Sequence, residues 1–204
     1  MLAGTNGAGK SSVAGAMLRE SGGDYFNPDE VARQLRERDA KLDQAAANAL
    51  AWKLGVRQLE RAIREGLDYF FETTLGGRTI VARLEQALAA GHEVRIWYAG
   101  LDSPEAHLAR VAARVRDGGH DIPEADVRRR FDQSRLNLLE LLPQLHELKL
   151  YDNSNEADPA RSHAPKPKLV LHCRAGKVIA PKQLAKTPAW AKPIVAQALK
   201  QQES

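Results

Sequence analysis

The chain has 204 residues, of which 43% are hydrophobic and 27% charged, with a net charge of +4. This length suits one domain, or one domain with an extension, and the composition excludes a wholly disordered chain. No apolar run approaches the ~18 residues of a membrane span, and the N-terminus lacks the features of a signal peptide. The single cysteine, Cys173, excludes an intramolecular disulfide. We therefore expect a cytoplasmic protein that does not enter membranes.

The positive charge is concentrated near the C-terminus. Residues 156–204 contain nine Lys or Arg and three Asp or Glu, whereas residues 1–155 are slightly acidic. A basic segment can bind phosphate backbones, but this one has no aromatic residue beyond Trp190 to stack on bases. A solvated basic extension is therefore favoured over nucleic-acid binding.

Strands and helices are expected to alternate as far as residue 154. Strands are predicted at 1–3, 25–26, 67–71, 94–99 and 148–151, and helices at 13–18, 28–35, 40–65, 80–90, 104–117 and 123–142. This order favours a parallel sheet wrapped by helices, in a main domain over residues 1–155. Residues 156–204 are expected to form a small basic C-terminal extension, with a linker at 158–167, a hairpin across Ala175-Gly176 and a short helix near 194–200.

Residues 4–11 read Gly-Thr-Asn-Gly-Ala-Gly-Lys-Ser and fit the phosphate-binding P-loop at every fixed position. The glycines let backbone N–H groups surround the phosphates, Lys10 reaches the same oxygens, and Ser11 is placed to bind Mg²⁺. The alternative is an ordinary glycine-rich turn. Only three residues precede the loop, so either the first strand is short or residues are missing before it. The expected nucleotide-binding residues here are Gly4, Asn6, Gly7, Ala8, Gly9, Lys10, Ser11 and Ser12.

Polar residues follow several of the predicted strands. Because ligands bind at the carboxyl ends of parallel strands, these positions are candidates for catalysis and binding. Asp29 is expected to act as a base, although the N-cap of the following helix is a competing role for it. Asp102 fits a capping turn better. The strand-end segments are 27–30, 72–74, Asp102 and 152–154.

Arginines gather in a helix–loop–helix segment at about residues 110–135. A phosphoryl-transfer lid needs guanidinium groups that close over the transferring phosphate. An exposed basic helix pair would have the same composition, and spacing alone does not separate the two. The arginines are Arg110, Arg114, Arg116, Arg128, Arg129, Arg130 and Arg135, and the loop is Gly118-Gly119-His120-Asp121.

Together these stretches resemble the zeta-toxin family of P-loop kinases, in its compact stand-alone branch. The resemblance covers about residues 1–155 and rests on segments 4–12, 27–30, 71–75, 114–123, 128–131 and 151–154. It implies a nucleoside-monophosphate-kinase-like core, the co-substrate ATP or GTP with Mg²⁺, and an antitoxin protein as partner. The best-known members phosphorylate the sugar 3′-hydroxyl of UDP-N-acetylglucosamine.

The resemblance also implies roles for individual residues. Lys10 and Ser11 would hold the nucleotide phosphates and Mg²⁺, with Asn153 beside the nucleotide. Asp29 would be the general base, and Arg114 and Arg130 would meet the γ-phosphate. The residues implied for acceptor binding are Glu72, Thr73, Thr74 and Arg78.

The chain departs from the family pattern at the second strand. That motif usually reads Asp-x-Asp followed by an arginine, whereas here Asn27 replaces the first Asp and Arg33 only loosely replaces the arginine. Glu72 has a second interpretation as a Mg²⁺ carboxylate, because it follows an apolar strand.

The sequence thus predicts an α/β P-loop kinase with a parallel sheet, flanking helices and an arginine-rich helical lid. Its acceptor is expected to be a hydroxyl of a small molecule, with a UDP-sugar as the specific hypothesis. Two alternatives remain: a polynucleotide or nucleoside kinase, and a nucleotide-dependent switch that transfers phosphate to no acceptor.

Overall fold

The computed structural model describes residues 1–11, 13, 25–155, 166–181 and 183–203. Within these residues, seven strands form one sheet in the order β2-β3-β1-β4-β5-β6-β7. The first five are parallel, whereas β6 and β7 run antiparallel to their neighbours. The strands are β1 (Leu2–Ala3), β2 (Tyr25–Phe26), β3 (Phe70–Thr73), β4 (Arg95–Gly100), β5 (Glu147–Asp152), β6 (Lys168–Arg174) and β7 (Lys177–Ala180).

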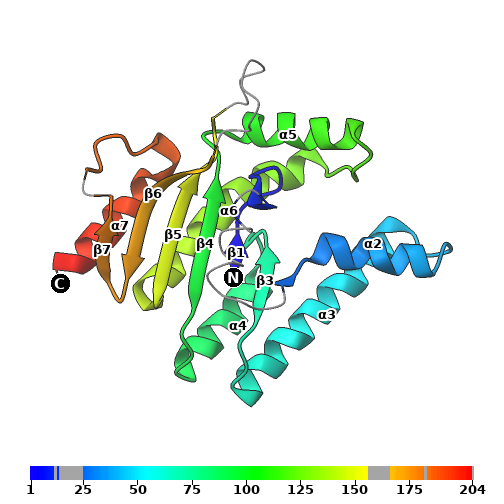
Figure 1. Cartoon of the computed structure of the whole chain (residues 1–204), viewed down its shortest axis with the longest axis horizontal. Coiled ribbons are helices and arrows are strands. Elements are labelled where there is room, and N and C mark those ends of the chain that lie inside the picture. The colour runs from blue at the N-terminus through cyan, green and yellow to red at the C-terminus, as the bar shows by residue number, and fades with distance from the viewer. Residues whose placement is uncertain (12, 14–24, 156–165, 182, 204) are drawn as a thin grey trace.

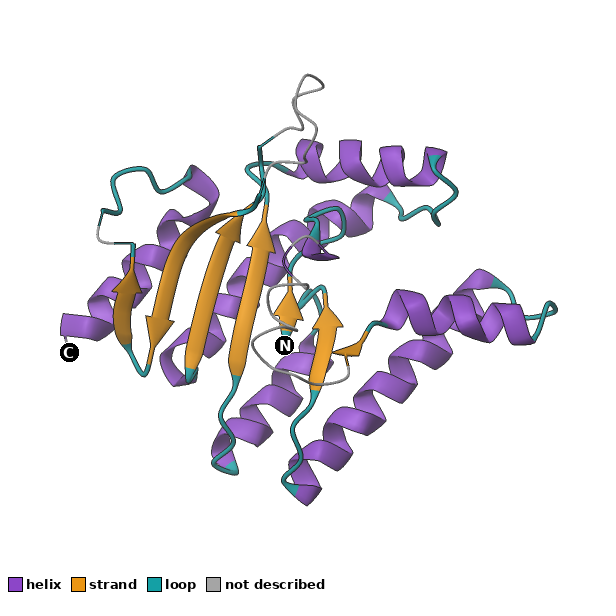
Figure 2. Cartoon of the chain, viewed as in Figure 1, coloured by secondary structure: helices purple, strands orange, loops and turns teal. Residues whose placement is uncertain are grey.

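Helices connect the parallel strands and cover the sheet (Figure 1). The described α-helices are α2 (Pro28–Arg38), α3 (Gln44–Glu65), α4 (Arg78–Ala89), α5 (Pro104–Arg116), α6 (Glu124–Leu141) and α7 (Lys192–Glu203). Short 3₁₀ turns, η1 (Leu142–Gln144) and η2 (Ala189–Ala191), follow α6 and precede α7. The predicted α/β architecture is confirmed (Figure 2). Most of the helix predicted after the P-loop lies outside the described residues.

Two element boundaries differ from the predictions in ways that affect the site. The strand predicted at 67–71 begins at Phe70 and ends at Thr73, so Glu72 belongs to β3. Helix α3 begins at Gln44 and not at residue 40, because the Asp43 carboxylate caps it by accepting from the N–H of Ala46 at 2.7 Å.

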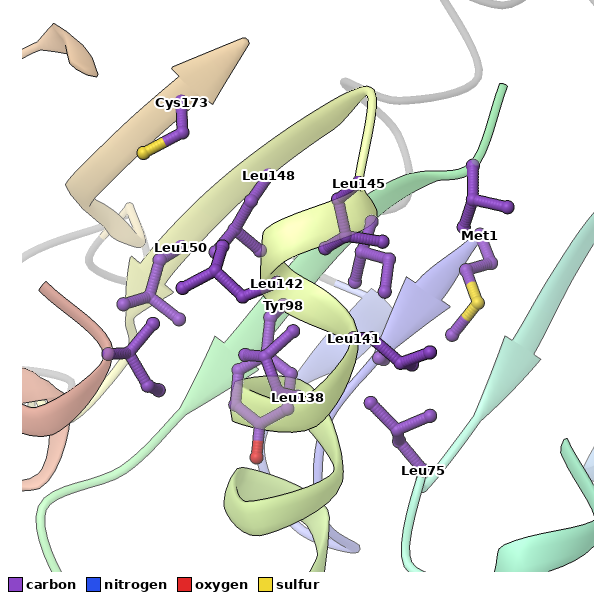
Figure 3. Close-up of a cluster of buried hydrophobic side chains, with 14 of the residues drawn as sticks. Met1, Leu75, Tyr98, Leu138, Leu141, Leu142, Leu145, Leu148, Leu150 and Cys173 are labelled. Atoms are coloured by element: carbon purple, nitrogen blue, oxygen red, sulfur yellow. The ribbon is translucent and has the colours of Figure 1, made fainter. Parts of the chain in front are cut away.

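The main hydrophobic core lies between the sheet and helices α4, α6 and α7. Leucines of η1, α6 and β5 interlock there with strand residues of β4 and with Met1 (Figure 3). Tyr98 is fully buried, and its hydroxyl hydrogen bonds with that of Ser134 at 2.9 Å. The labelled core residues are Met1, Leu75, Tyr98, Leu138, Leu141, Leu142, Leu145, Leu148, Leu150 and Cys173.

The C-terminal segment adds to this same sheet and core. The predicted hairpin is present, with β6 paired to β5 and a turn at Ala175-Gly176 whose φ values are +47° and +74°. Positive φ at both turn residues is the type I′ pattern that matches strand twist. Helix α7 buries Ile194 and Val195 in the main core. None of the described helices is both long and apolar enough to cross a membrane.

Candidate functional site

A cavity of about 810 Å³ lies where the P-loop, the β2–α2 turn, α3, β3 and the helical lid meet. The predicted residues that line it come from segments far apart in the sequence. This location agrees with the rule that ligands bind at the carboxyl ends of parallel strands. The predicted residues lining it are Asn6, Gly7, Gly9, Lys10, Ser11, Asp29, Glu72, Thr73, Thr74, Arg114 and Arg130.

The P-loop needs glycine where its backbone makes close contacts, as at Gly4 and Gly9. A Cβ on Gly4 would lie 2.2 Å from the carbonyl oxygen of Ala99, and one on Gly9 would lie 2.2 Å from Asn153 Nδ2. Both glycines also have positive φ, +141° and +72°. Asn153 donates from Nδ2 to the carbonyl of Ala8 at 2.9 Å, so this side chain holds the backbone of the P-loop in place.

Lys10 is buried and lies between the loop and β3. Its Nζ donates to the Gly4 carbonyl at 2.9 Å and lies 3.3 Å from Glu72 Oε1. The other Glu72 oxygen accepts a hydrogen bond from the Tyr25 hydroxyl. Burial and then the Glu72 charge raise the pKa of Tyr25, which keeps this hydroxyl protonated as a donor. Glu72 therefore has a partner at each oxygen.

Asp29 is not the helix cap that was its competing interpretation. The cap of α2 is Asn27, whose Oδ1 accepts from the backbone N–H of Asp29 at 2.9 Å. The Asp29 carboxylate faces the lid, with Oδ2 3.7 Å from Arg114 Nη1. Asp29 is therefore a cavity carboxylate at the start of a helix that another residue caps.

The lid consists of α5 and α6, and its arginines divide into two groups. Arg110, Arg114 and Arg130 line the cavity. Arg130 Nη1 donates to Asn6 Oδ1 at 2.8 Å, and Thr5 Oγ1 donates to the Arg130 carbonyl at 3.2 Å, so α6 is attached directly to the P-loop. Three others form ion pairs with acidic residues of the lid: Arg128 with Glu105 and Glu124, Arg129 with Asp126, and Arg135 with Asp132. Arg130 also pairs with Asp126, at 3.3 Å.

Several predicted site residues do not line the cavity, among them Gly4 and Ala8 of the P-loop and Asn153. Arg78 does not line the cavity: at the first position of α4, it forms an ion pair with Glu140 of α6 and donates to Asn137 Oδ1. The sequence placed it near β3 but gave no sign of this acidic partner. Ser12 lies outside the described residues. Asp102 lies in the turn before α5, where Ser103 is the cap, as expected.

Sequence reasoning missed His107, which lies beneath the P-loop. It is 1% exposed, and its Nδ1 lies 2.7 Å from the Asn6 carbonyl. Burial lowers the pKa of His107 to about 4. The neutral ring therefore donates from Nδ1 to that carbonyl. Within an amphipathic helix this histidine has no local signal that separates it from an ordinary core position.

The glycine-rich loop, its buried lysine and the mainly parallel sheet define a P-loop nucleotide-binding fold. Residues 1–135 match the family described as an AAA domain, and the chain belongs to this family. A relative from Haemophilus influenzae, described as an uncharacterized protein, is 31% identical over 128 residues, covering 63% of this chain and 88% of the relative.

Solved structures share the fold at low identity. The complex of AvrRxo1-ORF1 with ORF2 matches with a TM-score of 0.64 and 17% identity, over 98% of this chain and 69% of that one. A form of this complex with ATP matches with a TM-score of 0.65 and 17% identity, over 97% and 62%. A structure from the PezAT chromosomal toxin–antitoxin system of Streptococcus pneumoniae matches with a TM-score of 0.55 and 16% identity, over 100% of this chain and 86% of that one. The predicted resemblance to toxin-type P-loop kinases is thus confirmed at the level of the fold.

Proposed function

We propose that this protein transfers the γ-phosphoryl group of ATP or GTP to a hydroxyl of a small molecule. The observation that supports this most directly is the composition of the cavity. Lys10 of the P-loop, the Asp29 carboxylate and the lid residues Arg114 and Arg130 all line it. Phosphoryl transfer needs these three groups together: a phosphate site, a proton acceptor and cations for the transition state.

In the proposed reaction, Asp29 accepts the proton of the acceptor hydroxyl. The hydroxyl oxygen forms a bond to the γ-phosphorus while the bond from that phosphorus to the β–γ bridging oxygen breaks, and the nucleoside diphosphate leaves. Lys10, Arg114 and Arg130 offset the negative charge on the transferring group and the leaving oxygen. Arg114 would then exchange its contact with Asp29 for the phosphate.

The residues present fit a Mg²⁺ ion bound together with the nucleotide. Mg²⁺ usually takes one or two protein oxygens, phosphate oxygens and waters, and does not need a cage of protein ligands. Ser11 and Glu72 both line the cavity and supply oxygens of this kind. When bound, the ion would neutralise charge on the β- and γ-phosphates.

For the acceptor, we propose UDP-N-acetylglucosamine or a related UDP-sugar. Support comes from the family resemblance and from Glu72, Thr73 and Thr74, which line the cavity with groups that can bind sugar hydroxyls. A protein partner is proposed as well, since the matching AvrRxo1-ORF1 structure is a complex with ORF2 and PezAT is a toxin–antitoxin system.

The experiment is a transfer assay with γ-labelled ATP and GTP against UDP-sugars, oligonucleotides and a metabolite extract, with products identified by mass spectrometry. We expect label in a small-molecule product, and no label with Lys10→Ala. Label at oligonucleotide 5′ ends would identify a polynucleotide kinase. Nucleotide hydrolysis that no acceptor pool accelerates would identify a switch. Label in a small molecule other than a UDP-sugar would overturn the acceptor proposal alone.

A further inference from the structure

The cavity has an apolar wall that the phosphate chemistry does not use. Helix α3 contributes one face to it, with residues at the spacing of successive helical turns. Phe26 and Phe71 from the neighbouring strands β2 and β3 complete this surface. The residues of α3 that line the cavity are Asn48, Ala49, Trp52, Gly55 and Val56.

Trp52 is the most unusual member of this wall. It is 47% exposed, whereas Trp97 and Trp190 are each 4% exposed. Leaving an indole in water forgoes the stabilisation that its burial would give. Leu50, on the same helix, is also exposed but does not line the cavity. An exposed indole inside a concave site is positioned to stack on a ligand.

The Phe26 ring packs against α3 at Gly55 and lines the same cavity as Trp52. A Cβ on Gly55 would lie 2.7 Å from the Phe26 ring, so glycine is what allows this close approach. The ring is also held by Tyr69, at 6.2 Å between centroids, and Tyr69 stacks on Phe71 at 5.0 Å. We call Phe26, Trp52 and Phe71 the aromatic wall. Its phenylalanines are fixed by packing, and its tryptophan is open to the cavity.

Polar groups line the same cavity as this wall. Asn48 lies one helical turn before Trp52, and Gln44 Nε2 donates to its Oδ1 at 2.8 Å, which orients the amide. Its Nδ2 is a hydrogen-bond donor for the edge of a ring. Towards the P-loop, the same cavity contains Asp29 and Glu72. A matching ligand would carry a flat heterocycle at one end and hydroxyls at the other.

We propose that the aromatic wall binds the planar ring of a nucleoside-type acceptor, with Trp52 as its stacking residue and Asn48 contacting the ring edge. The inference rests on the proposed function in taking this ligand to be the acceptor. Trp52 is then a specificity-determining residue, because a sugar that carries no aromatic base has no planar ring to stack on the wall. Stacking a base on an aromatic side chain contributes enough that its removal weakens binding by about ten-fold or more.

Binding can be measured without any transfer. The full chain is saturated with Mg²⁺ and the non-hydrolysable analogue AMP-PNP, so that the nucleotide site is filled. Uridine, adenosine and, as the matched control, ribose are then titrated while tryptophan emission is followed. We expect the nucleosides to change the emission and ribose to have no effect. Trp52→Phe should abolish the signal, since the remaining tryptophans are buried.

Equilibrium dialysis of a labelled nucleoside then tests whether the aromatic ring at position 52 contributes to binding. Trp52→Ala should weaken nucleoside binding about ten-fold or more, Trp52→Phe should restore most of it, and Leu50→Ala should leave it unchanged. AMP-PNP affinity should stay constant in all three variants. Wild-type affinity in Trp52→Ala, or ribose binding as tightly as nucleosides, would overturn the inference.

These outcomes separate the inference from the proposed function. If nucleoside binding depends on Trp52 but the protein labels no acceptor, the aromatic wall is supported as a nucleoside site and the proposed kinase activity is refuted. If the protein yields a labelled product but its Trp52→Ala variant binds nucleosides normally, the kinase activity is supported and the role of the aromatic wall is refuted.

Discussion

Lys10 Nζ of the P-loop lies 3.3 Å from Glu72 Oε1 of β3, and both side chains are largely buried. The cation expected to bind the nucleotide phosphates is therefore paired with a carboxylate from another strand. A similar pair joins Arg114 of the lid to Asp29, at 3.7 Å. In both pairs, the proposed phosphate ligand is paired with a proposed acceptor-side carboxylate. Nucleotide binding should therefore release both carboxylates for the acceptor.

The Lys10–Glu72 pair predicts the behaviour of Glu72→Gln. The amide keeps the shape of the side chain but removes the negative charge beside the phosphate site. If Glu72 acts on the acceptor, the acceptor KM should rise or kcat should fall, while Mg·ATP affinity stays at least as high as in the wild type. Titration calorimetry with Mg·ATP and steady-state kinetics would check this. Weakened binding that appears only when Mg²⁺ is present would instead assign Glu72 to the metal.

Lys10→Ala should have the opposite effect on the nucleotide. It removes a charged donor and leaves the Glu72 carboxylate to repel the phosphates. We expect nucleotide affinity to fall by about ten-fold or more and transfer to be lost. Lys53→Ala, an exposed lysine on α3, is the control of equal charge change. Equal affinities in the two variants would contradict the P-loop assignment.

Asp29→Asn separates a proton acceptor from a structural group. Because Asn27 caps α2, the Asp29 substitution should leave the melting temperature nearly unchanged. Transfer should fall by about 10²–10⁴, the usual contribution of a general base. The matched control is Asn27→Ala, which should cost about 1 kcal/mol of stability through the lost cap. A variant of Asp29 that melts early and keeps its rate would contradict the proposed role.

The sequence predicts the parts of the site that are encoded by short segments. The P-loop has a fixed spacing of glycines, lysine and serine, and the residues that follow β2 and β3 reach one cavity because the ends of parallel strands meet. For the lid, sequence spacing left two interpretations open. Arg130, which also pairs with Asp126, is attached to Asn6 of the P-loop, while Arg128 and Arg129 pair with acidic lid residues.

Other features depend on partners that are distant in the sequence. Trp52 is exposed on α3, and its part in the cavity becomes visible only when the other segments that line the cavity are in place. Arg78 seemed close to the acceptor, yet Glu140, 62 residues away, attracts it to α6. The docking of α7 could not be foreseen either, because a short apolar helix does not indicate the surface on which it will pack.

The buried His107 predicts a pH dependence of stability. Its pKa is about 4 in the folded protein and about 6.5 when unfolded. Between these values the unfolded chain binds a proton that the folded protein does not, so stability falls as the pH drops through this window. The full loss is about 3 kcal/mol, at 1.36 kcal/mol per pKa unit. We expect His107→Asn, whose amide can still donate to the Asn6 carbonyl, to show a shallower slope between about pH 4 and 6.5 in denaturant titrations. Identical slopes would contradict the assignment of a buried neutral imidazole.

Trp190 predicts that the C-terminal segment is integral to the fold. Its indole packs on Gly100 of β4, where a Cβ would lie 2.5 Å from the ring, and its Nε1 donates to Asp152 Oδ1 at 3.2 Å. Trp190→Ala should therefore lower the free energy of unfolding by about 3–5 kcal/mol, through the cavity it leaves in the main core. Ile179→Ala, at an exposed position of β7, is the control and should change stability by less than about 0.5 kcal/mol. Chemical denaturation monitored by circular dichroism measures both. If Trp190→Ala unfolds at the wild-type midpoint, residues 166–203 are a detachable appendage, and the sheet formed by the parallel strands is stable without them.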